Sequence, residues 1–215
     1  MGVSTVFFDV GETLIDETRQ WGEWADWLGV TRLTFFALLG AVIERGGSHR
    51  DVFELVRPGF DLAAETARRA AAGCPYGFDA SDLYDDAAPC LRSLRDAGMR
   101  VGLAGNQPES AERALAEMGL AADVIATSQG WGVEKPSPEF FARVAAEVGV
   151  PPSEIAYVGD RVDNDVAPAR AAGMVAVFIR RGPWGYLHAA RPEAALAHVR
   201  LQSLAELPAA LAARK

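Results

Sequence analysis

Lysine is almost absent from this sequence of 215 residues. Of the 21 basic residues only Lys135 and Lys215 are lysines, and because Lys215 is the last residue, Lys135 is the sole internal lysine. The compact ammonium of lysine and the planar guanidinium of arginine are not interchangeable in a binding site. A chain that otherwise uses arginine for positive charge therefore points to a specific task for Lys135.

Cysteine and long apolar runs are scarce as well. Cys74 and Cys90 are the only cysteines and have no metal-ligand spacing, which predicts reduced thiols rather than a disulfide. Apolar runs such as residues 35–42 and 174–179 fall well short of the roughly 20 residues that a membrane-spanning helix needs. Residues 3–8 are strand-like and lack the features of a signal peptide. We therefore expect a soluble, cytoplasmic protein with no membrane partner.

Positive charge is in deficit overall. The 29 acidic and 21 basic residues give a formal net charge of −8. A chain of this charge repels nucleic acids and anionic membranes at long range, so we expect no nucleic-acid partner and favour a small molecule as the ligand. Half of the residues are apolar, which is enough to bury the core of one α/β domain with an inserted module. The oligomeric state stays open.

Five short runs of strand character recur along the chain, and a helical stretch precedes each of the last four. The runs are rich in β-branched and aromatic residues and cover residues 3–8, 100–104, 123–126, 155–158 and 175–179. The helical stretches end at glycines in the expected C′ position and cover residues 88–97, 109–118, 138–148 and 163–172. This alternation predicts right-handed βαβ units and a parallel sheet covered on both faces.

Residues 16–84 break this alternation. They contain no comparable strand run, and helical patterns cover residues 21–28, 31–44, 49–56 and 60–72. Turns that contain Gly and Pro separate these patterns. The sequence therefore predicts an α/β protein whose Rossmann-like core consists of residues 1–15 and 85–215, with a helical subdomain inserted at residues 16–84.

Polar side chains follow three of the predicted strands. Ligands bind at the carboxyl ends of the strands in a parallel α/β sheet, and Asp9, Gly105-Asn106 and Asp160 occupy these positions. Two carboxylates brought together repel each other unless a cation or a proton offsets their charge. A convergent pair of aspartates therefore indicates a site for a hard cation with oxygen ligands, for which Mg²⁺ is the natural choice.

Four segments, in order, resemble the motifs of the haloacid dehalogenase-like superfamily. Each is a weak signal alone, but together they span the chain, with the helical insertion between the first and the second. The segments are residues 7–14 (FFDVGETL), 103–106 (LAGN), 134–138 (EKPSP) and 158–165 (VGDRVDND). The resemblance implies a haloacid dehalogenase-like fold with a helical cap inserted after the first motif, and a hydrolase that acts on a small phosphorylated metabolite.

The resemblance also implies a role for each motif residue. Asp9 would attack phosphorus and form an aspartyl-phosphate that water then cleaves. Lys135 would neutralise the acidic cluster and orient the phosphoryl group, and Gly105 and Asn106 would contribute to substrate binding. Mg²⁺ would be held by Asp9, the backbone carbonyl of Gly11 and Asp160, with Asp165 as a further ligand or as the partner of the lysine.

Two positions depart from the motifs of the superfamily's phosphatases. Gly11 stands where a second aspartate usually protonates the leaving group and then activates water, and Gly105 stands where a Ser or Thr hydroxyl is usual. Loss of a general acid/base typically lowers the rate by about 10² to 10⁴. Loss of one donor to the developing charge lowers it by about 10² to 10³. We therefore expect slow phosphoryl transfer unless another group substitutes.

The sequence offers few substitutes for the missing groups. Glu12 adjoins the gap, but we expect it to be an exposed loop carboxylate. Arg19, Glu23 and Asp26 are further candidates within the helical insertion, where the sequence alone does not place them. The sequence therefore does not identify the group that replaces the second aspartate.

The absence of the second aspartate leaves other activities open. A dehalogenase uses the same nucleophile without a metal, but Asp160 would repel both its halide product and an acidic substrate, which disfavours this alternative. A phosphonate-cleaving relative needs a lysine in the insertion, and residues 16–84 contain none. The remaining alternative is a catalytically impaired protein that binds phosphate or a metabolite. A phosphatase is favoured over each of these.

Overall fold

The chain folds into two compact units. The computed structural model describes residues 2–214. Unit 1 contains the described residues up to Asp16 together with those from Asp79 onward, and unit 2 contains Glu17–Phe78.

The boundary after the insertion differs from the prediction. The sequence assigns residues 79–84 to the insertion, whereas they lie in unit 1. The Asp16 amide donates to the Asp82 carbonyl at 2.8 Å, and the Tyr84 amide donates to the Leu14 carbonyl at 3.0 Å. The backbone of residues 79–84 therefore pairs with the loop after the first strand, and this pairing attaches the segment to unit 1.

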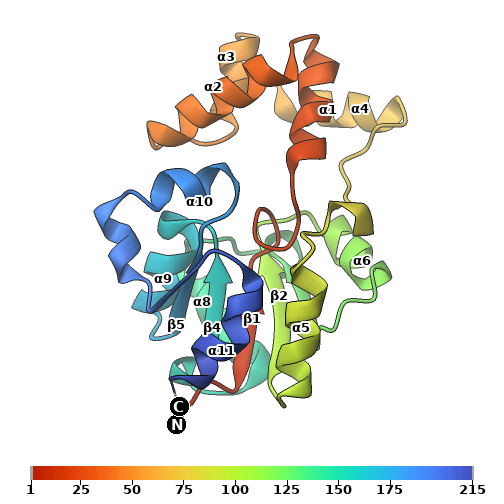
Figure 1. Ribbon diagram of the computed structural model, residues 1–215. Coiled ribbons are helices and arrows are strands. Elements are labelled where there is room, and N and C mark those ends of the chain that lie inside the picture. Colours follow the sequence, from red (N-terminus) through yellow and green to blue (C-terminus); the bar gives the residue numbers. More distant parts are fainter. Residues whose placement is uncertain (1, 215) are drawn as a thin grey trace. The chain divides into compact units, whose positions relative to one another are not determined.

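Unit 1 is built on a parallel sheet, as the sequence predicts. Among residues 2–214 the sheet has six strands in the order β3-β2-β1-β4-β5-β6, and each neighbouring pair is parallel (Figure 1). The strands are β1 (Thr5–Phe8), β2 (Arg100–Gly105), β3 (Val124–Thr127), β4 (Ile155–Gly159), β5 (Val175–Ile179) and β6 (Val199–Leu201). Every residue of β1 and β4 is buried, because parallel strands are covered on both faces.

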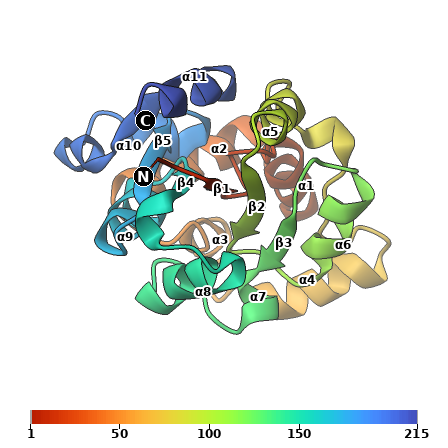
Figure 2. The same cartoon turned by 90° about the horizontal axis from the view of Figure 1, so that it is seen from below.

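Helices cover both faces of this sheet. Figure 2 shows α5 (Ala87–Asp96) and α11 (Leu207–Ala212) on one face, with α8 (Pro138–Val148) and α9 (Ala167–Ala171) on the other. The remaining helices of unit 1 are α6 (Ser110–Glu117), α7 (Ser128–Trp131) and α10 (Gly182–His188). Short 3₁₀ turns lie at Ala80–Asp82, Pro152–Glu154, Pro192–Leu196 and Leu204–Glu206. The aromatic core of unit 1 includes Phe7, Phe140, Phe141, Tyr157 and Phe178.

α8 shows how local sequence determines a helix in this fold. The Ser137 side chain accepts a hydrogen bond from the Glu139 amide at the N-terminus, where Pro138 occupies the first turn. Gly149 ends the helix in the left-handed conformation. Phe140, Phe141, Val144 and Val148 recur at helical spacing and are buried.

The C-terminal part of the sheet was not predicted completely. β6, α7 and α10 are absent from the prediction. β6 has only three residues, and one of them, Arg200, is exposed. The helix expected over residues 163–172 begins as a π-helix at Val162–Val166 and continues as α9. These elements are short, and their sequences carry little periodic signal.

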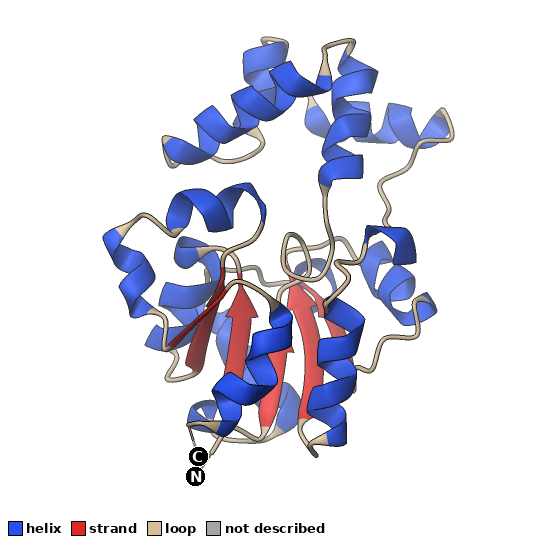
Figure 3. Cartoon of the chain, viewed as in Figure 1, coloured by secondary structure: helices blue, strands red, loops and turns tan. Residues whose placement is uncertain are grey.

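Unit 2 consists of helices and loops (Figure 3). The helices are α1 (Thr18–Leu28), α2 (Arg32–Glu44), α3 (Asp51–Val56) and α4 (Leu62–Ala71). Aromatic rings form their core: Phe53 packs edge-on against Trp24, with ring centroids 4.8 Å apart, and stacks on Phe60 at 4.9 Å. None of the described helices is both long and apolar enough to cross a membrane by itself, and α1 and α2 meet that test only as a pair bent by 113°.

Candidate active site

Two acidic side chains meet where neighbouring strands end. β1 and β4 pair with Phe8 opposite Val158, and Asp9 and Asp160 follow these two strands. The chain runs from β1 to β2 and β3 on one side and returns to β4 on the other. This reversal is the switch point at which α/β sheets bind their ligands. The Asp9 amide extends the pairing by donating to the Val158 carbonyl at 2.8 Å.

These aspartates form a cluster of buried carboxylates with Asp165. One oxygen of each lies within 4.8 Å of the others, and Asp9, Asp160 and Asp165 are 7%, 1% and 0% exposed. Burial, followed by the charges of Asp165 and Asp9, raises the pKa of Asp160 well above its ordinary value. The Asp160 Oδ2 atom is buried and has no hydrogen-bond partner among the described residues. Oxygens grouped in this way are suited to a cation.

Lys135 lies directly against the carboxylate cluster. Its Nζ atom is 2.7 Å from Asp9 Oδ1 and 2.5 Å from Asp165 Oδ1. Burial disfavours the ammonium ion, but the charges of Asp165 and Asp9 outweigh burial and hold the pKa of Lys135 well above its ordinary value. The Nζ atom also lies 5.4 Å from the ring centroid of Tyr157, which is fully buried on β4. The sole internal lysine is therefore a buried cation paired with two carboxylates.

Asp165 is held by the irregular helical turn that follows β4. Val162–Val166 form a π-helix. Such helices are rare in proteins overall, and those that occur are often found at functional sites. The Arg161 amide donates to Asp165 Oδ2 at 3.0 Å, while Oδ1 binds Lys135. A Cβ atom on Gly159 would lie 2.3 Å from Asp165 Cγ, so this position requires glycine. Burial raises the pKa of Asp165 to about 6, although Lys135 lowers it.

The Asn106 side chain supports Lys135. Asn106 Nδ2 donates to the Lys135 carbonyl, and the Lys135 amide donates to Asn106 Oδ1, both at 2.8 Å. Both ends of the side-chain amide are thus engaged by the backbone of one residue. Asn106 is exposed, and its amide keeps a second N–H and a second oxygen lone pair, so the predicted substrate contact does not require these two bonds to break.

Gly105 and Gly11 place different constraints on a larger residue. A Cβ atom on Gly105 would lie 2.5 Å from Asp9 Oδ1, so a larger residue there requires Asp9 to move. Gly11 lies in the loop after β1, where it forms an isolated bridge with Ile15. Its φ lies outside the left-handed region, which means that its backbone conformation is open to other residues.

Glu12 is buried, and the prediction of an exposed loop carboxylate is wrong. The residue is 5% exposed, and the Tyr84 hydroxyl donates a hydrogen bond to Glu12 Oε2 at 2.6 Å. Tyr84 stands 72 residues away in the chain. Because no local pattern reports so distant a contact, the sequence contained no signal for this burial.

The candidate substitutes in the insertion are engaged in ion pairs within unit 2. Arg19 Nη1 lies 2.7 Å from Glu23 Oε1, and Glu23 Oε2 lies 3.1 Å from Arg69 Nη2. Asp26 Oδ2 lies 2.7 Å from Arg32 Nη2. Each of these charged side chains therefore pairs with an opposite charge inside unit 2.

Known proteins that resemble this chain include phosphatases. The glyceraldehyde 3-phosphate phosphatase of Methanopyrus kandleri is 37% identical over 153 residues, which cover 66% of this chain and 64% of that protein. The phosphoserine phosphatase of Thermus thermophilus is 36% identical over 103 residues, which cover 46% of this chain and 41% of that protein. The chain thus spans less than two thirds of the length of either relative.

A solved structure and a family model extend the likeness along the chain. The structure of a HAD phosphatase from Thermococcus onnurineus covers 97% of this chain and 98% of that chain, with a TM-score of 0.61 and 25% identity. The model of the haloacid dehalogenase-like hydrolases matches residues 3–173. This range includes Asp9, Lys135, Asp160 and Asp165. The chain therefore belongs to the haloacid dehalogenase-like hydrolase family.

Proposed function

We propose that this protein is a Mg²⁺-dependent phosphatase that hydrolyses a small phosphorylated metabolite through Asp9, in the cytoplasm. The observation that carries the proposal is the contact between Asp9 and Lys135, in which a carboxylate at the switch point lies 2.7 Å from a buried ammonium. The names of the relatives, glyceraldehyde 3-phosphate phosphatase and phosphoserine phosphatase, support a substrate of this class. The net charge of −8 also favours a small ligand over a nucleic acid.

The residues of the site fit a divalent cation. The buried Asp160 Oδ2 atom lacks a hydrogen-bond partner among the described residues, and burial of such an atom is costly unless a charge offsets it. Asp9, Asp160 and the backbone carbonyl of Gly11 would hold the ion. Asp165 would be an outer partner, because its oxygens already bind Lys135 and a backbone amide. When bound, Mg²⁺ would offset the repulsion between Asp9 and the phosphate and keep Asp9 ionised.

The proposed reaction consists of two displacements at phosphorus. In the first, an Asp9 oxygen forms a bond to phosphorus while the bond to the leaving oxygen breaks, and the leaving group keeps the electron pair. In the second, a water oxygen forms a bond to phosphorus while the bond to Asp9 breaks. Inorganic phosphate departs and the carboxylate is restored. Lys135 stays protonated in both steps and holds Asp9 and the phosphoryl oxygens in place.

Because Gly11 has no acidic side chain, solvent donates and accepts the protons in this scheme. The leaving oxygen takes its proton from solvent in the first step, and the attacking water loses a proton to solvent in the second. A missing acid/base lowers the rate by about 10² to 10⁴. We therefore propose that aryl and acyl phosphates, whose leaving groups need no protonation, are cleaved far faster than alkyl phosphates.

A phosphatase screen with and without Mg²⁺ tests the proposed function. The wild type runs beside Asp9→Asn and beside Asp96→Asn, which makes the same change on an exposed residue at the end of α5. We expect phosphate release that depends on Mg²⁺, a loss of at least about 10³-fold in Asp9→Asn, and no change in Asp96→Asn. Release that persists in Asp9→Asn would refute the nucleophile.

The same screen distinguishes a phosphatase from the alternative, a catalytically impaired binding protein. The missing side chains at Gly11 and Gly105 favour this alternative. That alternative predicts that the wild type binds Mg²⁺ and inorganic phosphate but turns over no ester in the panel. Hydrolysis that depends on Asp9 excludes it.

A further inference from the structure

The buried side chain of Arg181, between β5 and α10, contacts the loop of residues 10–15 that follows β1. Arg181 is 9% exposed, and arginine is almost never buried unless it is paired. Its Nη1 atom donates to the Thr13 carbonyl at 2.8 Å, and its Nη2 atom lies 2.5 Å from Asp86 Oδ2. The guanidinium also lies over the Tyr84 ring, 4.1 Å from its centroid. Because a guanidinium presents several donors in one plane, this single side chain holds all of these groups at once.

The loop that Arg181 contacts closes on itself. The Leu14 and Ile15 amides donate to the Val10 carbonyl at 2.9 and 3.0 Å, and the Glu12 amide donates to the Ile15 carbonyl at 2.7 Å. Glu12 has a φ of 52°, the only positive φ of a non-glycine residue in the described part of the chain, and this conformation is uncommon for glutamate. Such a costly conformation persists only where the surrounding structure maintains it. The loop therefore depends on support from outside.

Arg181 and its neighbours supply this support. Thr13 is fully buried, and Arg181 is the only described residue that donates a hydrogen bond to its carbonyl. A buried carbonyl that loses its donor is destabilising. Tyr84, on whose ring Arg181 lies, donates to Glu12 Oε2 at 2.6 Å. A Cβ atom on Gly182 would lie 2.4 Å from the same oxygen, so the backbone next to Arg181 also packs against the loop.

The guanidinium itself is anchored by Asp86, which directly precedes α5. Asp86 Oδ2 also accepts hydrogen bonds from Ser203 Oγ at 2.7 Å and from the Leu204 amide at 2.9 Å. Burial raises the pKa of Asp86, but the hydrogen bonds from Arg181 and Ser203 outweigh burial and hold this pKa below its ordinary value. Asp86 therefore stays ionised, and it fixes the guanidinium against the elements that cover the sheet.

The position of this loop matters for the site, because Asp9 lies directly before it and Gly11 lies within it. A shift of about 1 Å in the groups of an active site can lower the rate about 100-fold. We propose that Arg181 is a positioning residue, which fixes the loop through the Thr13 carbonyl and so holds the Gly11 carbonyl in place as a ligand of the cation. This inference rests on the proposed function. Arg181 lies outside the residues that the family model matches.

Amide hydrogen exchange in the metal-free protein tests the order of the loop directly. Arg181→Lys keeps a positive charge near Asp86, but an ammonium lacks the planar fork that reaches both Asp86 and the Thr13 carbonyl. We expect the loop amides that donate to the Val10 carbonyl to exchange at least about 10-fold faster in this variant, while those of β1 are unchanged. Arg180→Lys is the matched control, because it makes the same change on the exposed neighbouring residue.

Steady-state kinetics with p-nitrophenyl phosphate and calorimetric titration of Mg²⁺ separate positioning from folding. We expect kcat per folded molecule of Arg181→Lys to fall about 10- to 100-fold, and its Mg²⁺ affinity to fall about 10-fold. KM should change less than about threefold, because Lys135, which the proposed function assigns to the phosphoryl group, keeps its contacts. Leu211→Ala, which leaves a cavity beneath α11, controls for loss of stability and should keep the wild-type kcat per folded molecule.

Four outcomes decide the inference. Loop exchange and kcat of Arg181→Lys that equal those of Arg180→Lys overturn the role of Arg181 and leave the proposed function intact. A loss of activity that only follows the unfolded fraction, as in Leu211→Ala, overturns it as well. A wild type that hydrolyses no ester refutes the proposed function, and the role of Arg181 in the reaction fails with it. Faster loop exchange together with a lower kcat supports the inference.

A second variant keeps the test decisive if Arg181→Lys does not fold. Asp86→Asn leaves the guanidinium in place but removes the charge that anchors it. We expect the same faster exchange of the loop amides and the same direction of change in kcat and Mg²⁺ affinity. Wild-type values in this variant would overturn the inference.

Discussion

Lys135→Met removes the buried ammonium from the carboxylate cluster while it keeps a side chain of similar length. In the wild type, Nζ lies 2.7 Å from Asp9 and 2.5 Å from Asp165, and the lysine side chain has no solvent exposure. The substitution therefore leaves two buried carboxylates without their cation. We expect this change to lower the free energy of unfolding more than any substitution of an exposed charge.

The magnitude follows from the distances and the burial. At an effective dielectric constant of about 20, unit charges 2.7 Å apart attract by about 6 kcal/mol. Burial of the ammonium offsets several kcal/mol of this attraction in the wild type. Removal of one partner of a buried ion pair destabilises proteins by about 3 to 5 kcal/mol, and we expect a loss in this range. The free energy of unfolding of such proteins is about 5 to 15 kcal/mol, so this loss is a large part of the total stability.

Urea unfolding in the presence of a chelator measures this loss, and its pH dependence identifies the cause. Without Lys135, the pKa of Asp165, which burial already raises to about 6, rises further above its unfolded value near 4. The folded variant then binds more protons than the unfolded chain, so its stability rises as the pH falls. The lysine of the wild type, whose pKa is raised, stays charged below pH 8. The deficit of Lys135→Met should therefore shrink between pH 8 and pH 5.

A second substitution serves as the control. Asp165→Asn in the Lys135→Met background removes one of the stranded charges and should recover more than about 1 kcal/mol. Asp96→Asn in the same background removes an exposed charge and should recover nothing measurable. A loss below about 1 kcal/mol in Lys135→Met, or a loss that does not change with pH, would refute the account of Lys135 as a buried cation.

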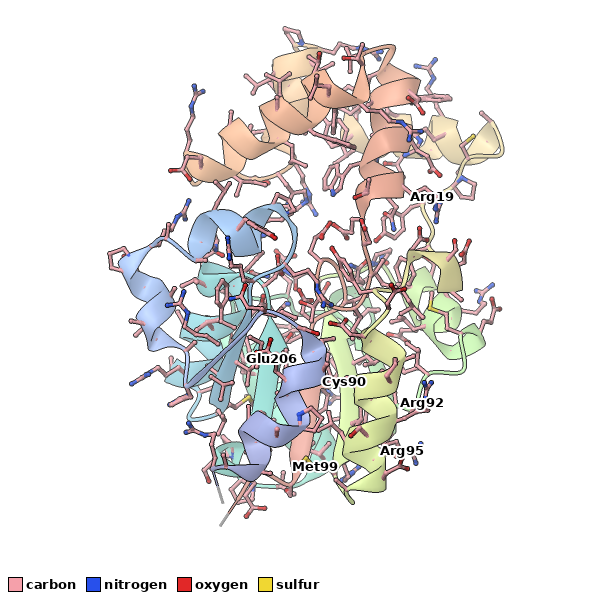
Figure 4. All side chains as sticks on the ribbon, in the orientation of Figure 1. Arg19, Cys90, Arg92, Arg95, Met99 and Glu206 are labelled. Atoms are coloured by element: carbon pink, nitrogen blue, oxygen red, sulfur yellow. The ribbon has the colours of Figure 1, made fainter. Side chains whose placement is uncertain are left out.

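Three further predictions concern Gly11, Gly105 and the cysteines. Gly11→Asp should raise the hydrolysis of alkyl phosphates by about 10-fold or more, because an aspartate supplies the missing acid at a position whose φ is not positive. An unchanged rate would show that another group acts. Gly105→Ser should lower activity instead of restoring it, because its Cβ meets Asp9, and steady-state kinetics decide between these outcomes. Cys90, which is labelled in Figure 4, is buried, and burial raises its pKa to about 12. A thiol reagent at pH 8 should therefore modify the exposed Cys74 in the native protein and both thiols only in denaturant.

Most of the sheet and the identity of the acidic residues follow from the sequence. Alternating strand and helix patterns predict β1 to β5 within a few residues, because each strand is a short apolar run bounded by turn signals. Asp9 and Asp160 follow such runs directly. Parallel strands end at one edge of the sheet, so the order of elements is enough to place these two carboxylates near each other. The scarcity of lysine in the sequence likewise identified Lys135 as a candidate site residue.

The tertiary structure alone decided which side chains support this cluster. Asn106 and Lys135 are 29 residues apart, and Glu12 and Tyr84 are 72 apart. A local pattern reports whether a residue follows a strand or lies on a helix face, but it does not report which distant side chain meets it. Burial of Glu12, the engagement of Asn106 and the pairing of residues 79–84 with unit 1 all depend on such distant contacts. They became visible only when the folded chain brought those segments together.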